Sequence, residues 1–155
     1  MLSFAHIKNV AHRDINLSNI KFIDKDCVRL KVIDWGSSKE FSETKLMIRK
    51  VGTSGFTAPE VLRKTERYNE KCDVFSAGVI LFRLVTGRYP FDAFDDQKIN
   101  DKVLRNKIKW DPKEWPPDRG AYELCQKMLE KDPHKRISST DALEKDTWMR
   151  WHSEK

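Results

Sequence analysis

Residues 71–86 constrain the fold of this 155-residue chain more than any other segment. Their apolar side chains surround nearly the whole circumference of a helix: Val74, Phe75, Ala77, Val79, Ile80, Leu81, Phe82, Leu84 and Val85. A surface helix is apolar along one stripe only, so a helix that is apolar on every side is a buried central helix. Gly87 follows as the expected C-terminal cap. The sequence therefore predicts a mainly α domain, a helical bundle around this central helix.

Length and composition are those of an ordinary globular domain. A length of 155 residues predicts one domain with a single core. Hydrophobic residues make up 39% and charged residues 35%, which is too apolar a balance for a disordered chain. The formal net charge is +6, and a basic chain can contact nucleic acid or anionic lipid. The basic residues alternate with acids in segments such as 63–70 and 127–135, however, which indicates a solvated mixed surface.

The cysteines and the lack of long apolar runs indicate the compartment. Cys27, Cys72 and Cys125 are odd in number and form no C-x-x-C pair, which argues against a disulfide framework or a zinc site. No apolar run approaches the roughly 18 residues of a membrane span. Residues 1–10 have no long apolar core behind a basic head, so they do not resemble a signal peptide. We expect a cytoplasmic or nuclear protein with no membrane partner.

Shorter elements are expected on both sides of the central helix. Segments 20–23 and 28–33 have the pattern of two short strands, and residues 24–26 supply turn chemistry between them. A small β-hairpin is therefore predicted near the N-terminus. The other predicted elements are a helix end at 1–7, a long loop at 37–57, an amphipathic helix at 95–106, a Pro-rich connector at 111–119, a helix at 121–130, and a last short helix after a capping box of Ser138 and Asp141.

Three short polar patterns follow one another along the chain. His-Arg-Asp at 12–14 is followed by Asn19, Asp-Trp-Gly at 34–36 directly follows the alternating strand, and Ala-Pro-Glu at 58–60 follows the long loop. Each pattern alone has a plain alternative, such as a turn carboxylate or a surface charge, because short motifs also arise by chance. Their joint occurrence in this order is far more specific. Two further residues complete the set, Asp73 near the start of the buried helix and Arg136 far downstream.

In this order and spacing, the chain resembles the C-terminal lobe of a eukaryotic serine/threonine protein kinase. The resemblance covers nearly all of the chain, with a catalytic loop at 12–19, an activation segment at 34–60 and the central helix at 71–86. The lobe of that family is mainly helical, which agrees with the fold predicted above.

Two details narrow the resemblance. Thr53 resembles the serine/threonine branch of the family rather than the tyrosine branch. Segments 68–84 and 89–91 are most similar to the calcium/calmodulin-dependent and calcium-dependent protein kinases. The function that this resemblance implies is ATP-dependent phosphoryl transfer to Ser or Thr of a protein substrate.

The resemblance also implies the catalytic roles. Phosphoryl transfer needs positioning and charge neutralisation more than covalent help. Asp14 would accept the proton of the substrate hydroxyl, while Asn19 and Asp34 would offer hard oxygen ligands to the Mg²⁺ that accompanies ATP. Because Asn19 and Asp34 flank the predicted hairpin, we expect them to converge on one pocket. Gly36 would let the backbone turn after Asp34.

Other matching residues would have structural roles around the site. By resemblance, Glu60 pairs with Arg136, and Asp73 accepts backbone N–H groups of the catalytic loop. His12 and Trp35 would stack in an internal hydrophobic column, with Trp35 in place of the commoner Phe. The residues given a structural part also include Arg13, Gly36 and Thr53.

The sequence departs from the family pattern at three positions. Asn16 stands where serine/threonine kinases usually carry a Lys that steadies the phosphoryl group, and a neutral hydrogen bond is about half as strong as a charge-assisted one. Lys21 replaces a large apolar side chain under the adenine ring, so its ammonium is either buried at a cost, snorkels to water, or reaches a phosphate or an acid. Arg49 occupies the usual phosphorylation position of the activation segment.

The N-terminal lobe of a kinase has no counterpart in this sequence. We find no glycine-rich phosphate loop, no strand lysine and no partner glutamate, so we expect this chain to form one wall of an ATP site. We expect it to be inactive or nearly so by itself. The face toward the missing lobe includes Ile20, Phe22 and Trp35, and we expect this apolar face to favour self-association.

Two other classes of function stay open on the sequence alone. Asn16 and Lys21 are compatible with a pseudokinase or interaction module that presents the helix at 95–106 to another protein. The net charge of +6 is compatible with nucleic-acid binding, but no groove-reading motif and no aromatic-basic interleaving supports it. We therefore expect no nucleic-acid partner.

Overall fold

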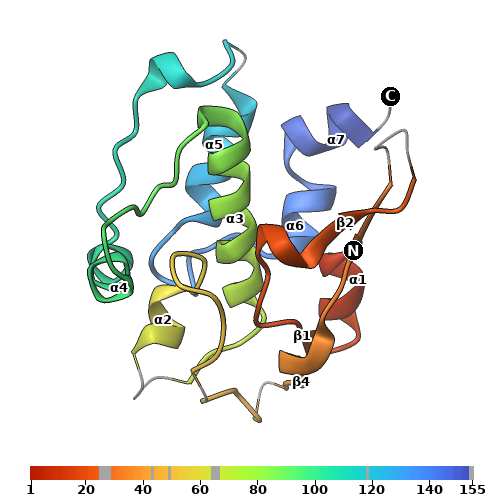
Figure 1. Cartoon of the computed structure of the whole chain (residues 1–155). Helices are drawn as coiled ribbons and strands as arrows, with labels where there is room; N and C mark the ends of the chain where they lie inside the picture. Colours follow the sequence, from red (N-terminus) through yellow and green to blue (C-terminus); the bar gives the residue numbers. More distant parts are fainter. Residues whose placement is uncertain (25–28, 43, 49, 64–66, 118, 154–155) are drawn as a thin grey trace.

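A central helix, α3 (Lys71–Thr86), organises the computed structural model, which describes residues 1–24, 29–42, 44–48, 50–63, 67–117 and 119–153. Helix α5 (Gly120–Met128) packs along α3 (Figure 1). Gly78 allows this close approach, because a Cβ atom there would lie 2.9 Å from the Cβ of Met128. Gly87 ends α3 in the left-handed region at φ 74°, as its predicted cap requires. The bounds predicted for the central helix are confirmed.

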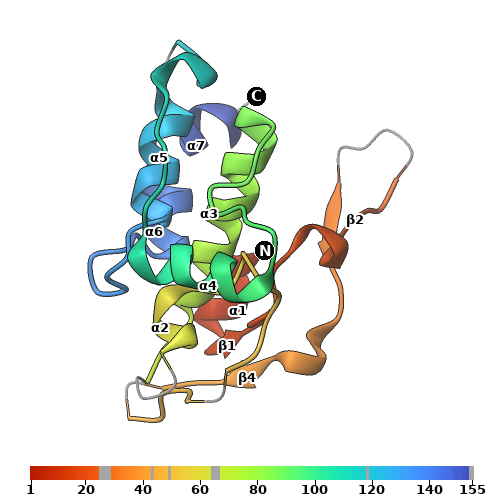
Figure 2. The ribbon, with the colours of Figure 1, turned by 60° about the vertical axis from the view of Figure 1, so that its left-hand side comes forward.

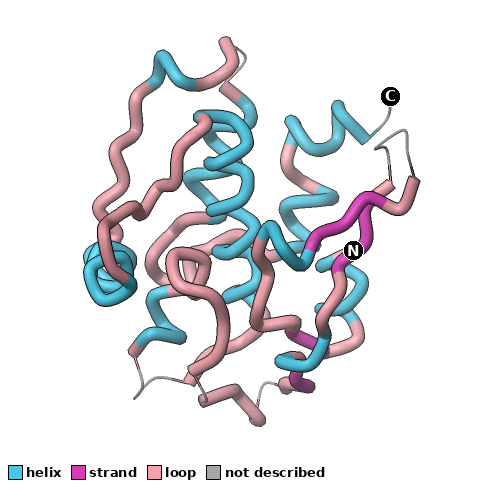
Figure 3. Tube along the Cα trace, in the orientation of Figure 1, coloured by secondary structure: helices cyan, strands magenta, loops and turns pink. Residues whose placement is uncertain are grey.

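The other helices surround this pair, and strands are few (Figure 3). The remaining α-helices are α1 (Leu2–Ile7), α2 (Pro59–Leu62), α4 (Asp96–Arg105), α6 (Ser139–Glu144) and α7 (Thr147–Ser153). Short 3₁₀ helices span Leu17–Asn19, Trp35–Ser37 and Pro112–Glu114. The mainly α fold class is confirmed, and no helix among the described residues combines the length and apolar character that crossing a membrane requires.

Local capping signals set the ends of two outer helices. The side chain of Asp95 accepts a hydrogen bond from the Lys98 backbone N–H at the start of α4, and Asn106 ends that helix in the left-handed region. The Ser138 hydroxyl oxygen accepts a hydrogen bond of 3.0 Å from the Asp141 backbone N–H, as expected of the predicted capping box. The expectation that α6 is the last helix is wrong, because α7 follows it.

Two small antiparallel sheets lie near the N-terminus. Strand β2 (Ile20–Phe22) pairs with β3 (Leu30–Val32), which confirms the predicted hairpin, although Val28 lies outside the described residues. The hairpin stands away from the helical body (Figure 2). None of its six strand residues is fully buried.

The second sheet was not predicted. Strand β1 (Val10–Ala11) pairs with β4 (Lys39–Glu40). Strand β4 lies inside the segment 37–57, which was expected to be a long loop. An isolated bridge also joins Met47 to Tyr68, and Met47 is fully buried. The activation-segment region is therefore tied to the body at several points.

An aromatic part of the hydrophobic core lies between α3, α5 and the segment that links α4 to α5. Phe82 of α3 contacts Trp110 and Trp115 edge-to-face, with ring centroids 5.5 and 5.6 Å apart. Tyr122 of α5 closes this cluster, 5.4 Å from Trp110 and 5.3 Å from Trp115. Each such aromatic pair adds about 0.5–1.5 kcal/mol beyond the burial of its area. This cluster thus fixes α3, whose first turn carries Asp73.

Candidate active site

Asp73 in the first turn of α3 anchors the segment that carries the His-Arg-Asp pattern. Its two carboxylate oxygens accept hydrogen bonds of 2.7 Å each from the backbone N–H groups of His12 and Arg13. Asp73 is 1% exposed, and a buried carboxylate is stable only with such donors. Arg13 has φ 71°, a left-handed conformation that is strained outside glycine and that these bonds hold in place. The predicted contact of Asp73 with the catalytic loop is present.

The Asp14 carboxylate is held by three side chains. Its Oδ1 accepts a hydrogen bond of 2.7 Å from the Thr53 hydroxyl and one of 3.1 Å from the Asn16 carboxamide. Its Oδ2 accepts only a long bond of 3.4 Å from the Asn19 carboxamide. One carboxylate oxygen is thus fixed, and the other keeps capacity to accept a further hydrogen bond.

Asn16 also has a structural role that was not predicted from the sequence. Its Oδ1 accepts hydrogen bonds of 2.9 and 3.2 Å from the backbone N–H groups of Ser18 and Asn19, which caps the 3₁₀ helix Leu17–Asn19. Its Nδ2 meanwhile donates to Asp14 and, at 3.0 Å, to the Thr53 hydroxyl. Asn16 is only 6% exposed. Both ends of this carboxamide therefore hold the loop together.

The hairpin brings Asn19 and Asp34 to the same end of the β2–β3 ladder. The Ile33 backbone N–H donates to the Asn19 carbonyl oxygen at 2.9 Å, one residue before Asp34. The Asn19 side-chain N–H donates at 2.9 Å to the Asp14 backbone carbonyl. The side-chain oxygen of Asn19, Oδ1, accepts no hydrogen bond from the described residues. Asp34 is exposed and left-handed at φ 59°, and its carboxylate accepts a hydrogen bond of 3.3 Å from the Gly36 backbone N–H.

These oxygen atoms fit a hard divalent cation. Mg²⁺ in proteins is held through one or two carboxylates together with substrate phosphates and waters, rather than by an all-protein cage. Asp34 and the Asn19 Oδ1 provide that kind of donor set. The described residues contain no group of three or more His, Cys, Asp or Glu that could hold a metal ion.

Aromatic contacts support the Asp-Trp-Gly turn. The rings of His12 and Trp35 lie edge-to-face with centroids 4.6 Å apart, and His12 is fully buried. His12 Nε2 lies 3.0 Å from the Ile33 carbonyl oxygen, and the Trp35 indole N–H donates to the Val32 carbonyl at 3.2 Å. The predicted contact of the two rings is present, and it ties the segment after β3 to the His-Arg-Asp segment.

Arg13 links two further parts of the chain. Its Nε–H donates at 2.6 Å to the Ser37 carbonyl, and its guanidinium donates at 3.3 Å to the Tyr68 hydroxyl. Burial raises the pKa of the Tyr68 hydroxyl above its ordinary value, so this group stays protonated. Arg49, the position considered for phosphorylation, lies outside the described residues.

Three predicted residues lie apart from the Asp14 cluster, and one contributor was missed. Glu60 and Arg136 form a separate buried ion pair. Lys21 is exposed on β2 opposite Lys31, so its ammonium carries no burial cost. His6 of α1 was not singled out, although its Nε2 lies 3.0 Å from Asp73 Oδ2. A histidine on a predominantly apolar helix was the only signal that the sequence offered for it.

Comparison with known proteins gives the family of this chain. The family model described as the protein kinase domain matches residues 1–149. The chain belongs to the protein kinase domain family, which confirms the resemblance.

Known relatives are calcium-dependent protein kinases. The chain is 39% identical to calcium-dependent protein kinase 4 of Plasmodium berghei over 96% of its length, and 38% identical to calcium-dependent protein kinase 4 of Plasmodium falciparum over 99%. It is 37% identical over 97% of its length to calcium-dependent protein kinase 19 of Oryza sativa. The chain spans only 28 to 29% of the length of these relatives.

Proposed function

We propose that this chain is the substrate-binding lobe of a serine/threonine protein kinase that transfers phosphate from Mg-ATP to a protein hydroxyl. The observation that carries the proposal is the Asp14 carboxylate, held by Thr53, Asn16 and Asn19 beside the end of the β2–β3 hairpin. The family membership and the calcium-dependent kinases among the relatives support it.

Asp14 is the proposed catalytic base. Thr53 and Asn16 fix its Oδ1, so Oδ2 is the oxygen that accepts the proton of the substrate hydroxyl. The Asn19 carboxamide and the Asp34 carboxylate are the proposed Mg²⁺ ligands. When bound, ATP would supply the phosphoryl group and Mg²⁺ would neutralise charge on it. Asn16 brings no cation to that group, so its contribution is to position Asp14 rather than to stabilise the phosphoryl charge.

The interaction-module hypothesis is less well supported than the kinase hypothesis. It rested on Asn16 and Lys21, yet Asn16 maintains the geometry of Asp14 and Lys21 is exposed rather than buried in the site. The site thus keeps the carboxylate and carboxamide groups that the kinase reaction needs. For its partners we propose a protein substrate and a nucleotide-binding lobe, and for its location the cytoplasm or nucleus.

The test is phosphoryl transfer by this chain together with the proposed nucleotide-binding lobe, as a full-length protein. With Mg-ATP, we expect it to phosphorylate Ser- and Thr-containing peptides in preference to Tyr-containing ones, and Asp14→Asn to abolish transfer. The 155-residue chain assayed alone is expected to be inactive or nearly so. No transfer by the full-length protein, or transfer that survives Asp14→Asn, would contradict the proposal.

We also propose self-association of the isolated chain through the face formed by Ile20, Phe22 and Trp35. Phe22 is 59% and Trp35 37% exposed, and exposed large apolar side chains near one another favour association. Light scattering of the 155-residue chain tests this, with Phe22→Ser as the matched variant. A monomer at all accessible concentrations would contradict it.

A further inference from the structure

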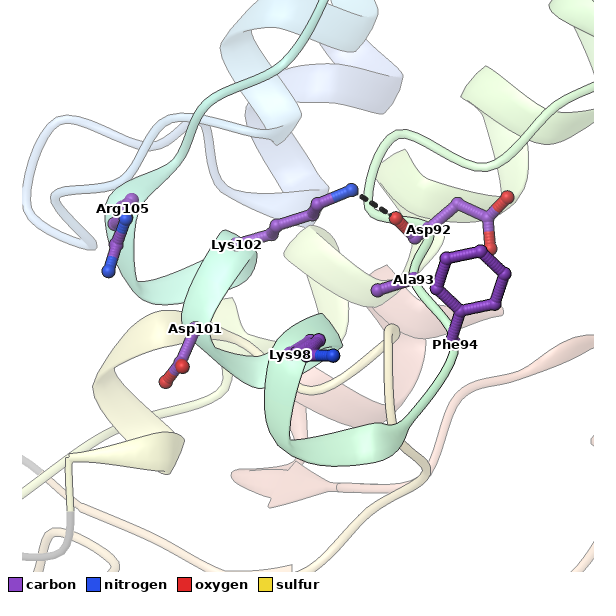
Figure 4. Close-up of a pocket in the computed structure, with 7 residues that line it drawn as sticks. All are labelled: Asp92, Ala93, Phe94, Lys98, Asp101, Lys102 and Arg105. Carbon is purple, nitrogen blue, oxygen red and sulfur yellow. Dashed lines mark hydrogen bonds between the residues drawn. The ribbon is translucent and has the colours of Figure 1, made fainter.

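A hollow of about 620 Å³ lies between α4 and the segment that leads into it. Lys98, Lys102 and Arg105 of α4 line it together with Asp92 and Phe94 of that segment, and Figure 4 shows Lys102 reaching toward Asp92 while Arg105 lies at the far end of the helix from Phe94. A second hollow of about 440 Å³ adjoins it, because Asp92, Lys102 and Arg105 line both. We call the two together the basic groove, and define it by the residues Phe94, Lys98, Lys102, Arg105, Lys107 and Lys109.

Some cations of the basic groove are already engaged. The Lys102 ammonium donates to the backbone carbonyl of Asp92 across the hollow (Figure 4). Lys98 lies 3.4 Å from the Asp95 carboxylate. These contacts hold the two walls together, but the Lys102 contact neutralises no charge.

Other cations of the groove have no carboxylate partner. Arg105, Lys107 and Lys109 are exposed, and no carboxylate of the described residues lies within ion-pair distance of them. Three like charges along one hollow create a positive potential that attracts anionic groups. The groove therefore presents positive charge that is not held in close ion pairs with the described carboxylates.

An apolar side chain stands at the other end of the groove. Phe94 is fully exposed, at 103% of its reference area, beside the hollow in Figure 4. A large exposed aromatic side chain next to cations is the composition of a protein-binding hot spot, where aromatic and basic residues provide most of the affinity. Because of Phe94, the basic groove offers an apolar contact in addition to positive charge, which a purely electrostatic anion site does not.

We propose that the basic groove binds an acidic segment of a partner protein, with carboxylates on Arg105, Lys107 and Lys109 and an apolar side chain on Phe94. The acidic segment lies outside these 155 residues, because they have a net charge of +6 and no acidic run longer than Asp95-Asp96. This binding goes beyond the proposed kinase function, because it uses neither Asp14 nor the phosphate site.

A peptide fits the groove better than a nucleic acid. The carboxylates of Asp92 and Asp101 also line the first hollow. A nucleic acid carries closely and evenly spaced phosphates, which would be forced against these carboxylates. A peptide can space its acidic side chains to avoid them and place an apolar side chain between, so charge complementarity favours the peptide.

The test is fluorescence anisotropy of the full chain with a dye-labelled peptide of Glu and Asp residues around one Leu. We expect binding that weakens as salt is raised, and no binding of the same peptide with Gln and Asn in place of the acids. Arg105→Glu/Lys107→Glu is expected to weaken binding about tenfold or more, because it replaces attraction by repulsion at two contacts. Phe94→Asn is expected to weaken binding without changing its salt dependence.

Matched controls separate this site from net charge and from the kinase proposal. Lys8→Glu/Lys135→Glu makes the same change of charge at exposed residues outside the groove, and should leave affinity nearly unchanged. Asp14→Asn should bind the peptide like the unmodified chain, whatever its effect on phosphoryl transfer. Absence of peptide binding, equal weakening by the control pair, or tighter binding of an RNA oligonucleotide through Arg105 and Lys107 would overturn the proposal.

Discussion

Arg136 and Glu60 form a two-point ion pair in the interior of the lobe. The guanidinium donates to the two carboxylate oxygens at 2.6 and 2.9 Å, and both side chains are about 1% exposed. Arg136 also donates to the backbone carbonyls of Glu130 and Lys71 at 2.8 and 2.9 Å. The pair thus joins α2, the start of α3 and the segment before α6, so the end of the activation segment is fixed to the helical body.

Breaking this pair from one side should be strongly destabilising. Arg136→Met leaves the Glu60 carboxylate buried without its partner, and such a change costs about 3–5 kcal/mol. Urea unfolding followed by circular dichroism measures the loss. The double variant Glu60→Gln/Arg136→Met should recover part of it, because neither charge is then left alone. Additive losses in that cycle would show that the two side chains are not coupled.

Gly52→Ala should cost more stability than Gly87→Ala. Both glycines have positive φ, 112° and 74°, which an alanine adopts at a cost of about 1–2 kcal/mol. A Cβ atom at Gly52 would also lie 2.9 Å from the Thr57 hydroxyl and 3.0 Å from the Arg13 carbonyl, whereas Gly87 has open space. Thermal unfolding of the two variants compares them directly. Equal shifts of the midpoint would mean that the activation segment relaxes around residue 52 without cost.

The elements that could be predicted from the sequence are those whose signals are local. The apolar circumference of α3, the Gly87 cap and the Ser138 capping box all lie within a few residues of the structure they specify. The β1–β4 pair could not be predicted, because its strands have two residues each and Val10 pairs with Glu40 far along the chain. Met47 lies in the segment expected to be a loop, yet its side chain packs in the hydrophobic core and its backbone bridges to Tyr68.

The same distinction applies to the candidate site. Asp14, Asn16 and Asn19 are near in sequence, so their proximity follows from one tight turn. Thr53 was identified only through the resemblance, since its bond to Asp14 spans 39 residues. The capping role of Asn16 was not predicted. The difference from the family's Lys was interpreted only as a lost charge, although Asn also brings a side-chain oxygen that can accept backbone hydrogen bonds. Such an acceptor is common before a helical turn.

Asn16→Ala should lower both stability and the rate of phosphoryl transfer. Loss of the cap on Leu17–Asn19 costs about 1 kcal/mol, and release of the Asp14 carboxylate should lower kcat about ten- to hundredfold through poorer positioning. Urea unfolding and assays on the full-length protein measure the two effects. Ser138→Ala is the matched control, because it removes the cap of α6 and should leave kcat unchanged. A fall of kcat in both variants would attribute the effect to stability alone.

The Arg88–Glu114 pair should make stability depend on acid pH. The Arg88 guanidinium donates to the Glu114 carboxylate at 2.6 Å and holds the pKa of that carboxyl below its ordinary value of 4.5. A lowered pKa in the folded state means that the stabilisation is complete above the unfolded pKa and is lost as the pH falls through the folded value. Between about pH 6 and about pH 3, the free energy of unfolding should fall less for Glu114→Gln than for the unmodified chain. Urea unfolding of both proteins at the two pH values measures this difference. Glu40→Gln removes an exposed carboxylate that forms no ion pair with a described residue, and it controls for the change in net charge. Parallel pH dependence of the unmodified chain and Glu114→Gln would show that this pair contributes nothing to acid sensitivity.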